Sequence, residues 1–316
     1  MTSKSLYREF CKEREGIPLF SRPWWLDAAV GPEAWDVALV IEDGVLCASL
    51  AYVSKSLGPL RVITQPAMTQ TAGPVLHIPP AKDAKAQRSQ EKRLYQSLID
   101  ALPQYHVFRQ TCDPSVTNWL PFYWRGFQQT TQYSYVINDI SDPAAVVRTF
   151  SKGKKSDLSK ARKSLTVTRG ASGADLFEHH RQSLRKQGRE ILYSKELICS
   201  LVNAAKHEDA GEVFAVSDPD GIVHSLYWIV WDESKAYYVV NSVDPEFRGS
   251  GSTSLALLEI LEFLKGKTKA FDFEGSMIEP VEFSYRQLGG EQQPLQALTH
   301  VPNRLLRIAL FAIGRL

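Results

Sequence analysis

The sequence of 316 residues predicts a mixed α/β fold made of two tandem units. A chain of this length exceeds one small core and suits two domains of about 150 residues each. Segments that alternate like strands are interspersed with segments of helical period, an order typical of mixed α/β proteins. Two similar stretches, PFYWRGFQQTTQYSYVI at 121–137 and SYRQLGGEQQPLQAL at 284–298, indicate a duplicated unit. We expect an N-terminal unit over 1–140, a C-terminal unit over 141–300 and an amphipathic helix over 301–316.

The first unit is expected to begin with a helix and continue into a sheet. Pro23 after Ser21 marks a helix start, and WWLDAAVG carries that helix to a glycine stop. AWDVALVI and VLCASLAYV flank an Asp-Gly turn and predict a hairpin, to which RVITQP adds a strand. The polar segment 64–80 is expected to be a loop and a candidate cleft wall. Further elements are expected at 90–102 (helix), 105–111 (strand), 117–124 (helix) and 131–137 (strand).

The second unit is expected to open with a basic helix around 152–164 that leads into a strand at 165–170. GEVFAVSD, IVHSLYWIVWD and AYYVVNSV are separated by short turns and predict a three-stranded antiparallel meander. The other elements are expected at 175–187, 194–206 and 252–264 (helices), 269–274 (strand), 281–288 (helix) and 294–299 (strand).

Composition excludes several classes of protein. Apolar residues make up 44% of the chain and charged residues 23%, values typical of a globular protein, so neither disorder nor a fibrous repeat is expected. Four scattered cysteines form no CxxC pair and predict neither a disulfide framework nor a zinc site. The polar N-terminus and the lack of an apolar run of about 18 residues predict a cytoplasmic protein.

A net charge of +2 hides a local basic segment at 151–169. Such a segment could bind phosphate, nucleic acid or anionic lipid, and a solvated helix face is the alternative. Its basic residues, set against the single acid Asp157, are Lys152, Lys154, Lys155, Lys160, Arg162, Lys163 and Arg169.

The stretch SVDPEFRGSGSTSLALLEILEFL reads as a strand, a glycine-containing turn and a helix. The free N–H groups at the start of a helix bind phosphate oxygens, and glycines let the backbone approach a pyrophosphate closely. An ordinary turn is the competing interpretation. The candidate phosphate-binding residues are Arg248, Gly249, Ser250, Gly251 and Ser252.

The stretch FDFEGSMIEPVEFSYRQLGG places two carboxylates on one side of a strand and a phenol on the next helix. Asp272 or Glu274 could act as a general base on an amine, and Tyr285 could donate a proton to a leaving group. A turn-capping Asp272 and a core Tyr285 are the structural alternatives.

Together, R-x-x-G-x-x before a helix and the closing Y-R-Q-L-G-G resemble the N-acetyltransferase superfamily known as GNAT. The resemblance implies that 248–252 hold the coenzyme A pyrophosphate and that Tyr285 lies beside the thiol leaving group. It also implies that the strand residues Asn241, Ser242 and Val243 pair with the pantetheine arm through backbone groups. Thr253 and Gly290 depart from the usual GNAT pattern.

Two GNAT-like units, the basic helix KGKKSDLSKARK and FDFEGS followed by FSYRQLGG resemble the FemAB group, the peptidoglycan-bridge aminoacyltransferases and their shorter acyltransferase relatives. The resemblance implies an enzyme that moves an acyl group from acyl-CoA, its co-substrate, to an amine of an amino sugar, peptide or cell-envelope precursor. It leaves open a second donor, aminoacyl-tRNA, and implies no metal. A non-catalytic nucleic-acid-binding module that uses the basic helix is the competing class.

Two further segments are candidates for substrate contacts. Arg185, Gln187 and Tyr193 lie in a polar turn after a helix and could touch the acceptor. The histidines have no paired ligand spacing and are expected to be structural. The tail PNRLLRIALFAIGRL predicts an amphipathic helix that could lie on a membrane surface, with docking against the body or a second subunit as the alternative.

Overall fold

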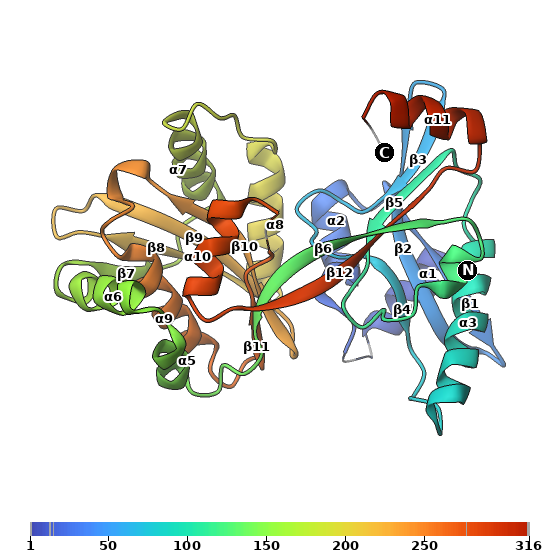
Figure 1. Cartoon of the computed structure of the whole chain (residues 1–316), viewed down its shortest axis with the longest axis horizontal. Helices are drawn as coiled ribbons and strands as arrows, with labels where there is room; N and C mark the ends of the chain where they lie inside the picture. The colour runs from blue at the N-terminus through green and yellow to red at the C-terminus, as the bar shows by residue number, and fades with distance from the viewer. Residues whose placement is uncertain (1, 13, 15, 276, 315–316) are drawn as a thin grey trace. The chain divides into compact units, whose positions relative to one another are not determined.

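The computed structural model describes residues 2–12, 14, 16–275 and 277–314. By its internal contacts the chain forms two compact units (Figure 1). The first consists of Met1–Gln132 together with Pro294–Leu316, and the second is Tyr133–Gln293. Helices and strands alternate in both, so the predicted mixed α/β class is confirmed.

The first unit contains a sheet whose strand order is β1-β2-β3-β5-β12, with β4 also paired to β2. The pairs are antiparallel except for β3 with β5. Its elements are α1 (Ser3–Lys12), the 3₁₀ turn η1 (Leu19–Ser21), α2 (Pro23–Val30), β1 (Trp35–Glu42), β2 (Val45–Leu57), β3 (Leu60–Thr64), β4 (Gly73–Leu76), α3 (Ala84–Asp100), β5 (Val107–Thr111), α4 (Leu120–Tyr123) and α11 (Arg304–Ala312).

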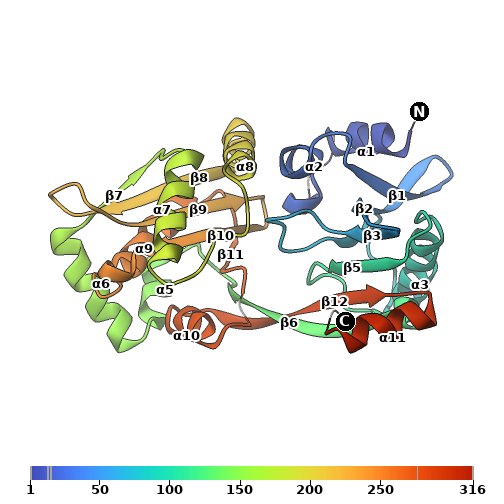
Figure 2. The same ribbon diagram turned by 90° about the horizontal axis from the view of Figure 1, so that it is seen from above.

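Alternation along β1 and β2 divides the core of the first unit into two layers. Trp35 and Val37 pack with Tyr7 and Leu26, from α1 and α2, on one face of the sheet. Ala38, the next residue after Val37, packs on the other face in the cluster that includes Leu94 and Leu98 of α3. Successive strand residues point to opposite faces, so the period of the sequence sets both layers. Figure 2 shows the two groups of helices.

The second unit contains a sheet in the order β6-β11-β10-β9-β8-β7. Only β10 and β11 pair in parallel. Its elements are β6 (Gln128–Ile137), α5 (Pro143–Thr149), α6 (Lys152–Ser164), β7 (Thr166–Arg169), α7 (Gly173–Arg185), α8 (Lys195–His207), β8 (Gly211–Ser217), β9 (Val223–Trp231), β10 (Lys235–Val243), η2 (Pro245–Phe247), α9 (Ser252–Leu264), β11 (Ala270–Asp272), α10 (Glu279–Gln287) and β12 (Glu291–His300). The division between units falls inside β6 and β12.

Helix α9 is the centre of the second core. Most of its residues are buried, including Leu255, Leu257, Leu258, Leu261 and Leu264, and they pack on aromatic residues of β9, β10 and β11. A helix that is apolar on nearly every side is a core helix rather than a surface one. Helix α7 lies on the opposite face, where His179 meets Ser242 of β10.

The two similar stretches of sequence adopt the same local structure. Each is a short helix followed by a glycine of positive φ and then a strand: α4, Gly126 at 84° and β6 in the first case, α10, Gly289 at 86° and β12 in the second. L-residues with side chains rarely adopt this backbone conformation, so glycine fixes both turns.

Several predicted elements need correction. Segment 64–80 is not wholly a loop, because it contains β4, and the prediction missed α1 and α5 altogether. Strand β4 exists through its pairing with Ala48–Ala51 of β2, and four residues are too few to show a period of their own. Strand β11 ends at Asp272, before the predicted 274, because the chain enters positive φ at Glu274 and Gly275.

Candidate active site

The predicted glycine bend leads directly into α9. Gly251 is the residue before the helix and has a left-handed backbone, with φ 79° and ψ 7°. A side chain there would also collide with the backbone carbonyl of Asp157 on α6 and come within 3.1 Å of Ala161. Gly249, in contrast, is exposed and has nothing within 4 Å of a hypothetical Cβ. Gly251 is therefore required by packing, whereas Gly249 leaves an accessible stretch of backbone.

The start of α9 presents polar groups typical of an anion site. Ser250 Oγ accepts a bond from the Ser252 N–H at 3.3 Å, while no described residue accepts from the N–H groups of Thr253 and Ser254. Arg248 is exposed and donates to Gln187 Oε1 at 2.6 Å. Free N–H groups at a helix start and a nearby guanidinium attract phosphate oxygens.

Strand β10 offers an open backbone edge beside this bend. Its parallel pairing with β11 covers only Lys235–Tyr237, so within the described part of the chain no strand pairs with that edge from Tyr238 to Val243. The pairing with β9 shifts register between Tyr238 and Val240, which marks a bulge. The predicted residues 241–243 lie on this free edge, where backbone groups could pair with an extended ligand.

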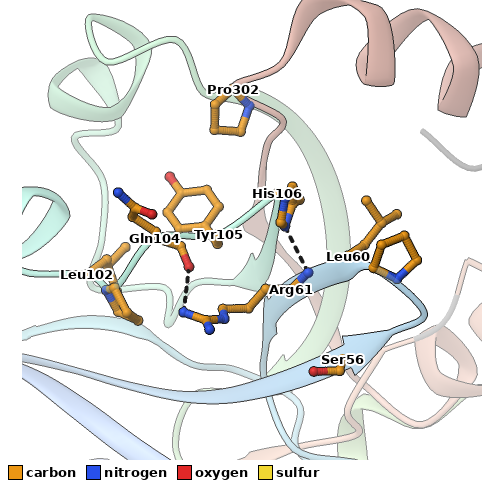
Figure 3. A pocket seen from close by; sticks show the side chains of 10 residues that line it. Ser56, Leu60, Arg61, Leu102, Gln104, Tyr105, His106 and Pro302 are labelled. Atoms are coloured by element: carbon orange, nitrogen blue, oxygen red, sulfur yellow. Dashed lines mark hydrogen bonds between the residues drawn. The ribbon is translucent and has the colours of Figure 1, made fainter.

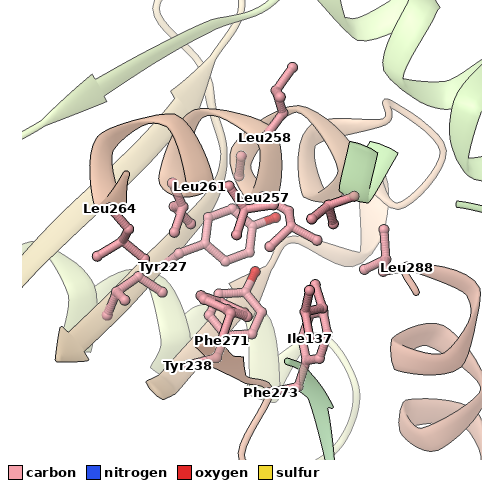
Figure 4. Packing of buried hydrophobic residues seen from close by; sticks show 14 of the residues in the cluster. Ile137, Tyr227, Tyr238, Leu257, Leu258, Leu261, Leu264, Phe271, Phe273 and Leu288 are labelled. Atoms are coloured by element: carbon pink, nitrogen blue, oxygen red, sulfur yellow. The ribbon is translucent and has the colours of Figure 1, made fainter. Parts of the chain in front are cut away.

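A row of tyrosines connects the bend with α10. Tyr227 donates to Thr253 Oγ1 at 3.1 Å and stacks on Tyr238 with 5.4 Å between ring centroids (Figure 4). Burial, and then the nearby Tyr227 and Tyr285, raise the pKa of Tyr238 well above its usual value. The first turn of α9 and Tyr285 therefore lie at two ends of one buried polar seam.

Buried polar atoms along this seam have no partner among the described residues. They are Asn241 Oδ1, Ser254 Oγ and Glu274 Oε1. Nearly all buried polar groups in proteins form hydrogen bonds, so such a concentration is typical of a place where water or a ligand completes them.

Tyr285 is held firmly on α10. Its ring stacks on Phe273 at 4.8 Å and 18°, and only 6% of the residue is exposed. Burial raises the pKa of its hydroxyl to about 12, the Asn241 side chain lowers it, and the charges of Glu274 and Asp272 raise it further. The phenol is thus protonated at neutral pH and close to polar groups of β10 and the β11 end.

The Gly-Gly pair after α10 also has a packing reason. A Cβ on Gly290 would lie 3.0 Å from the Tyr135 side chain and 3.2 Å from the Phe273 ring. A larger residue at 290 would displace the ring on which Tyr285 stacks. Gly290, which departs from the usual GNAT pattern, therefore fits the packing of Tyr135 and Phe273 around it.

The two predicted carboxylates have different surroundings. Asp272 is completely buried and accepts bonds from Ser134 Oγ, from the Glu274 N–H at 2.8 Å and from Lys235 Nζ at 3.4 Å. Glu274 has positive φ, and its Oε1 is buried with no partner among the described residues. Burial, and then the Asp272 charge, raise the pKa of Glu274 to about 8. Asp272 organises the strand end, whereas Glu274 has the properties of a base.

The residues predicted to touch the acceptor are not all in one place. Gln187 joins the bend through its bond with Arg248, and Arg185 is exposed at the end of α7. Tyr193 instead contacts His180, with 2.6 Å between Tyr193 Oη and His180 Nδ1. Burial raises the Tyr193 pKa and lowers that of His180 to about 4.

Sequence reasoning missed His179 as a neighbour of the predicted site. Its Nδ1 lies 2.7 Å from Ser242 Oγ, and its Nε2 is buried without a partner among the described residues. Burial lowers its pKa, so the ring is neutral at pH 7. In the sequence, the only sign that His179 could lie near the site is its position on the inward face of an amphipathic helix.

The pockets of the first unit are separate features. One, of about 600 Å³, is lined by ten residues that include Arg61, Gln104 and His106 (Figure 3). The Arg61 guanidinium donates to the Gln104 carbonyl at 3.4 Å, and the Arg61 N–H donates to His106 Nδ1 at 2.9 Å. The guanidinium of Arg61 therefore already has a hydrogen-bond partner within this pocket.

No helix in the described ranges is long and apolar enough to cross a membrane. Those residues also include no group of three or more histidines, cysteines or acids that could hold a metal ion.

Comparison with known proteins identifies the fold. Residues 148–276 match the acetyltransferase (GNAT) domain family. The whole chain resembles the crystal structure of FemX, with TM-score 0.72, 12% identity and 98% of each chain covered. It also resembles L-PGS from Bacillus licheniformis (TM-score 0.54, 9% identity, 99% of this chain and 97% of that one). A third similar structure is a tandem GNAT protein from the clavulanic acid biosynthesis pathway (TM-score 0.51, 12% identity, 94% and 93% covered).

No curated protein sequence gives a significant match. The domain match contains the bend at 248–252 and the strand end at 272–274, but stops before α10. The predicted tandem GNAT fold is confirmed, and the chain resembles the FemAB group in its fold through FemX. The acetyltransferase domain match over 148–276 supports an acyl-transferring enzyme.

Proposed function

We propose that this chain, whose residues 148–276 match the acetyltransferase (GNAT) domain family and whose fold resembles that of FemX, transfers an acyl group from acyl-CoA to a primary amine. The observation that carries this proposal is the seam of unpartnered polar atoms between the start of α9 and Tyr285. The proposed acceptor is an amine of an amino sugar, a peptide or a cell-envelope precursor.

The residues present fit coenzyme A as the donor's carrier. The N–H groups of Thr253 and Ser254, together with residues 248–252, would hold its pyrophosphate, and Arg248 would add a positive charge. The free edge of β10 at Asn241, Ser242 and Val243 would pair with its pantetheine amides. The Thr253 and Ser254 N–H groups and the β10 edge facing away from β9 are not taken up by another described strand or helix, whereas Arg248 already donates to Gln187.

Glu274 is the proposed general base. An amine must lose a proton before it attacks a carbonyl, and a base is most effective when its pKa is near the working pH. The raised Glu274 pKa of about 8 meets that requirement. Asp272 contributes indirectly, because its charge helps to raise this pKa and it accepts the Glu274 N–H.

Tyr285 is the proposed group beside the departing sulfur. A thiol has a pKa of about 8.5, well below the value of about 12 for this phenol. Complete proton transfer from the phenol to a thiolate would therefore be uphill, so with a thioester donor Tyr285 would act mainly by hydrogen bonding to the sulfur. The departing sulfur could then be protonated from solvent.

An aminoacyl-tRNA donor is the second candidate, supported by two observations. The leaving group of an ester is an alkoxide, a stronger base than a thiolate, and it could take the Tyr285 proton outright. Helix α6 also exposes Lys155, Lys160, Arg162 and Lys163 beside the α9 start. Such a cluster would attract a nucleic-acid backbone.

A binding comparison tests the donor assignment. We would measure acetyl-CoA by calorimetry and charged tRNA by filter binding, using the wild type and Gly249→Val. Because Gly249 lies in open space with ordinary φ, the variant should keep its thermal stability but lose at least tenfold in acetyl-CoA affinity. Equal affinity in a folded Gly249→Val would remove the bend from the donor site. Binding of charged tRNA alone would select the second donor.

Helix α11 supports contact with a membrane-bound acceptor. Leu305, Ile308 and Phe311 are exposed by 78%, 60% and 74%, and Arg304 is exposed beside them. An apolar helix face with a flanking cation is typical of an interfacial helix. Sedimentation with anionic vesicles should decrease for Leu305→Ser with Phe311→Ser, and unchanged sedimentation would contradict the contact.

A further inference from the structure

A second pocket lies in the first unit, away from every residue assigned above. It has a volume of about 660 Å³ and is formed by α3, α4 and the segment between β5 and α4. Pockets of this size hold small molecules of the size of a nucleotide. The lining residues are Lys85, Arg88, Ser89, Lys92, Thr117, Asn118, Trp119, Leu120 and Trp124.

The pocket is positively charged. Lys85, Arg88 and Lys92 fall at helical spacing on one face of α3, and all three are exposed. The lining contains no carboxylate, and neither lysine forms an ion pair with a described residue. The pocket therefore presents two lysines without an ion-pair partner among the described residues, whereas Arg88 is paired with Glu91.

A buried acid holds the polar groups of the pocket in place. Glu91 is only 8% exposed and accepts from Arg88 Nη1 and from Asn118 Nδ2, each at 2.9 Å, and from Gln87 Nε2 at 3.1 Å. Burial alone would raise its pKa, but the hydrogen bonds from Asn118, Gln87 and Arg88 lower it. An ionised carboxylate behind the pocket fixes Arg88 and Asn118, as in sites built for recognition.

An accessible aromatic surface completes the pocket. Trp124 is 54% exposed, and Lys92 Nζ lies 5.1 Å from its ring centroid. Trp119 lines the pocket and meets Tyr123 edge to face at 5.4 Å. Tryptophan and tyrosine are enriched at binding surfaces, because their rings are mostly apolar and carry one polar group.

We propose that this pocket binds a nucleotide unit, with the base on Trp124 and the phosphate on Lys85 and Arg88. Stacking aromatics combined with a basic groove are the shared features of sites that hold unpaired nucleotides. The amide of Asn118 and the hydroxyl of Thr117 can meet a base edge or a ribose. The same chemistry is offered by a free nucleotide and by the single-stranded end of an RNA.

The proposal is independent of the transferase reaction, because binding can be measured without turnover. The probes are UDP and ADP by calorimetry and a fluorescein-labelled single-stranded oligoadenylate RNA by anisotropy, all with the full chain. Loss of one stacked base corresponds to about 1–3 kcal/mol, so Trp124→Ala should weaken binding roughly 5- to 150-fold. Trp124→Phe should restore most of the affinity, which a purely structural role would not require.

Alanine variants of two arginines distinguish binding in this pocket from attraction by the general charge of the surface. Arg88→Ala should lower affinity at least fivefold, whereas Arg61→Ala, in a different pocket of the same unit, should leave it unchanged. Binding of the RNA should weaken with salt, by a slope of about 0.7 per phosphate contact. Tighter binding of UDP or ADP than of the RNA per nucleotide would identify a free nucleotide, and the reverse order an RNA end.

Three results would overturn the proposal. They are a failure of every probe to bind at about 1 mM, equal binding by Trp124→Ala and wild type, and equal losses for Arg88→Ala and Arg61→Ala. A fourth result would also overturn it: if only the triple alanine variant of Lys154, Lys155 and Lys160 loses RNA binding, the nucleic-acid surface is α6 and this pocket is not the site.

Discussion

The Glu274→Gln substitution tests the proposed base through stability and rate together. In the folded protein the Glu274 pKa is raised from 4.5 to about 8, by burial first and then by Asp272. The fold therefore favours the protonated carboxyl. Its contribution to stability is complete below pH 4.5 and is lost as the pH rises from there to about 8. Glutamine is neutral at every pH, so the Glu274→Gln variant should not lose this stability as the pH rises.

The magnitude follows from the two pKa values. Their difference corresponds to at most ~5 kcal/mol of unfolding free energy at alkaline pH. Part of Glu274 contacts water, so we expect Glu274→Gln to be ~1–3 kcal/mol more stable than wild type at about pH 9, with no gain at about pH 4. Urea unfolding at the two pH values measures both quantities.

Glu282→Gln is the matched control. The Glu282 carboxylate accepts from Tyr135 at 2.7 Å, and this bond lowers its pKa, so that its contribution to stability is present above the unfolded-state pKa and is lost in acid. Removing this charge should therefore give no gain at pH 9. A gain of the same size in both variants would mean that Glu274 has no special environment.

The rate should change in the opposite direction. The wild-type kcat/KM should rise with pH towards a plateau above about 8, because the base must be ionised. Glu274→Gln should lower the rate by about 10²- to 10⁴-fold and flatten this profile. A variant that is more stable at pH 9 but equally active would refute the assignment of Glu274 as the base.

Three further outcomes are expected. Tyr285→Phe should lower turnover roughly ten- to a thousandfold while leaving acetyl-CoA affinity unchanged, and an unaltered rate would remove Tyr285 from the mechanism. Gly251→Ala should destabilise the fold by ~1–3 kcal/mol in urea titrations, because it adds both positive-φ strain and a collision with α6. Combined alanine substitution of Lys154, Lys155 and Lys160 should abolish charged-tRNA binding in filter assays if α6 holds that donor, and leave acetyl-CoA calorimetry intact.

The local parts of the fold could be predicted because their signals are local. The predicted bounds 252–264 coincide with α9, since its glycine start and apolar face are written in consecutive residues. The sequence predicts Asp272 and Glu274 on one side of a strand, and alternation then puts Phe271 and Phe273 on the other side, where both lie in the core. Both predictions used only spacing within one element.

Other parts of the site could not be predicted because they depend on distant pairings. The neighbourhood of His179 and Ser242 joins residues 63 positions apart, and the seam of Tyr227, Tyr238 and Tyr285 joins three elements. The raised Glu274 pKa requires burial by residues remote in sequence. The spacing of residue types in a single sequence does not show which distant residues come into contact.

The return of the chain through β12 makes the first unit a host and the second an insertion within it. Residues 133–293 are continuous, whereas the host is interrupted and regains a sheet strand only from residue 294 onward. Residues 133–293 therefore precede in the chain the segment 294–316 that completes the host. The part that contains the whole proposed active site is also the part that could be excised as one uninterrupted piece.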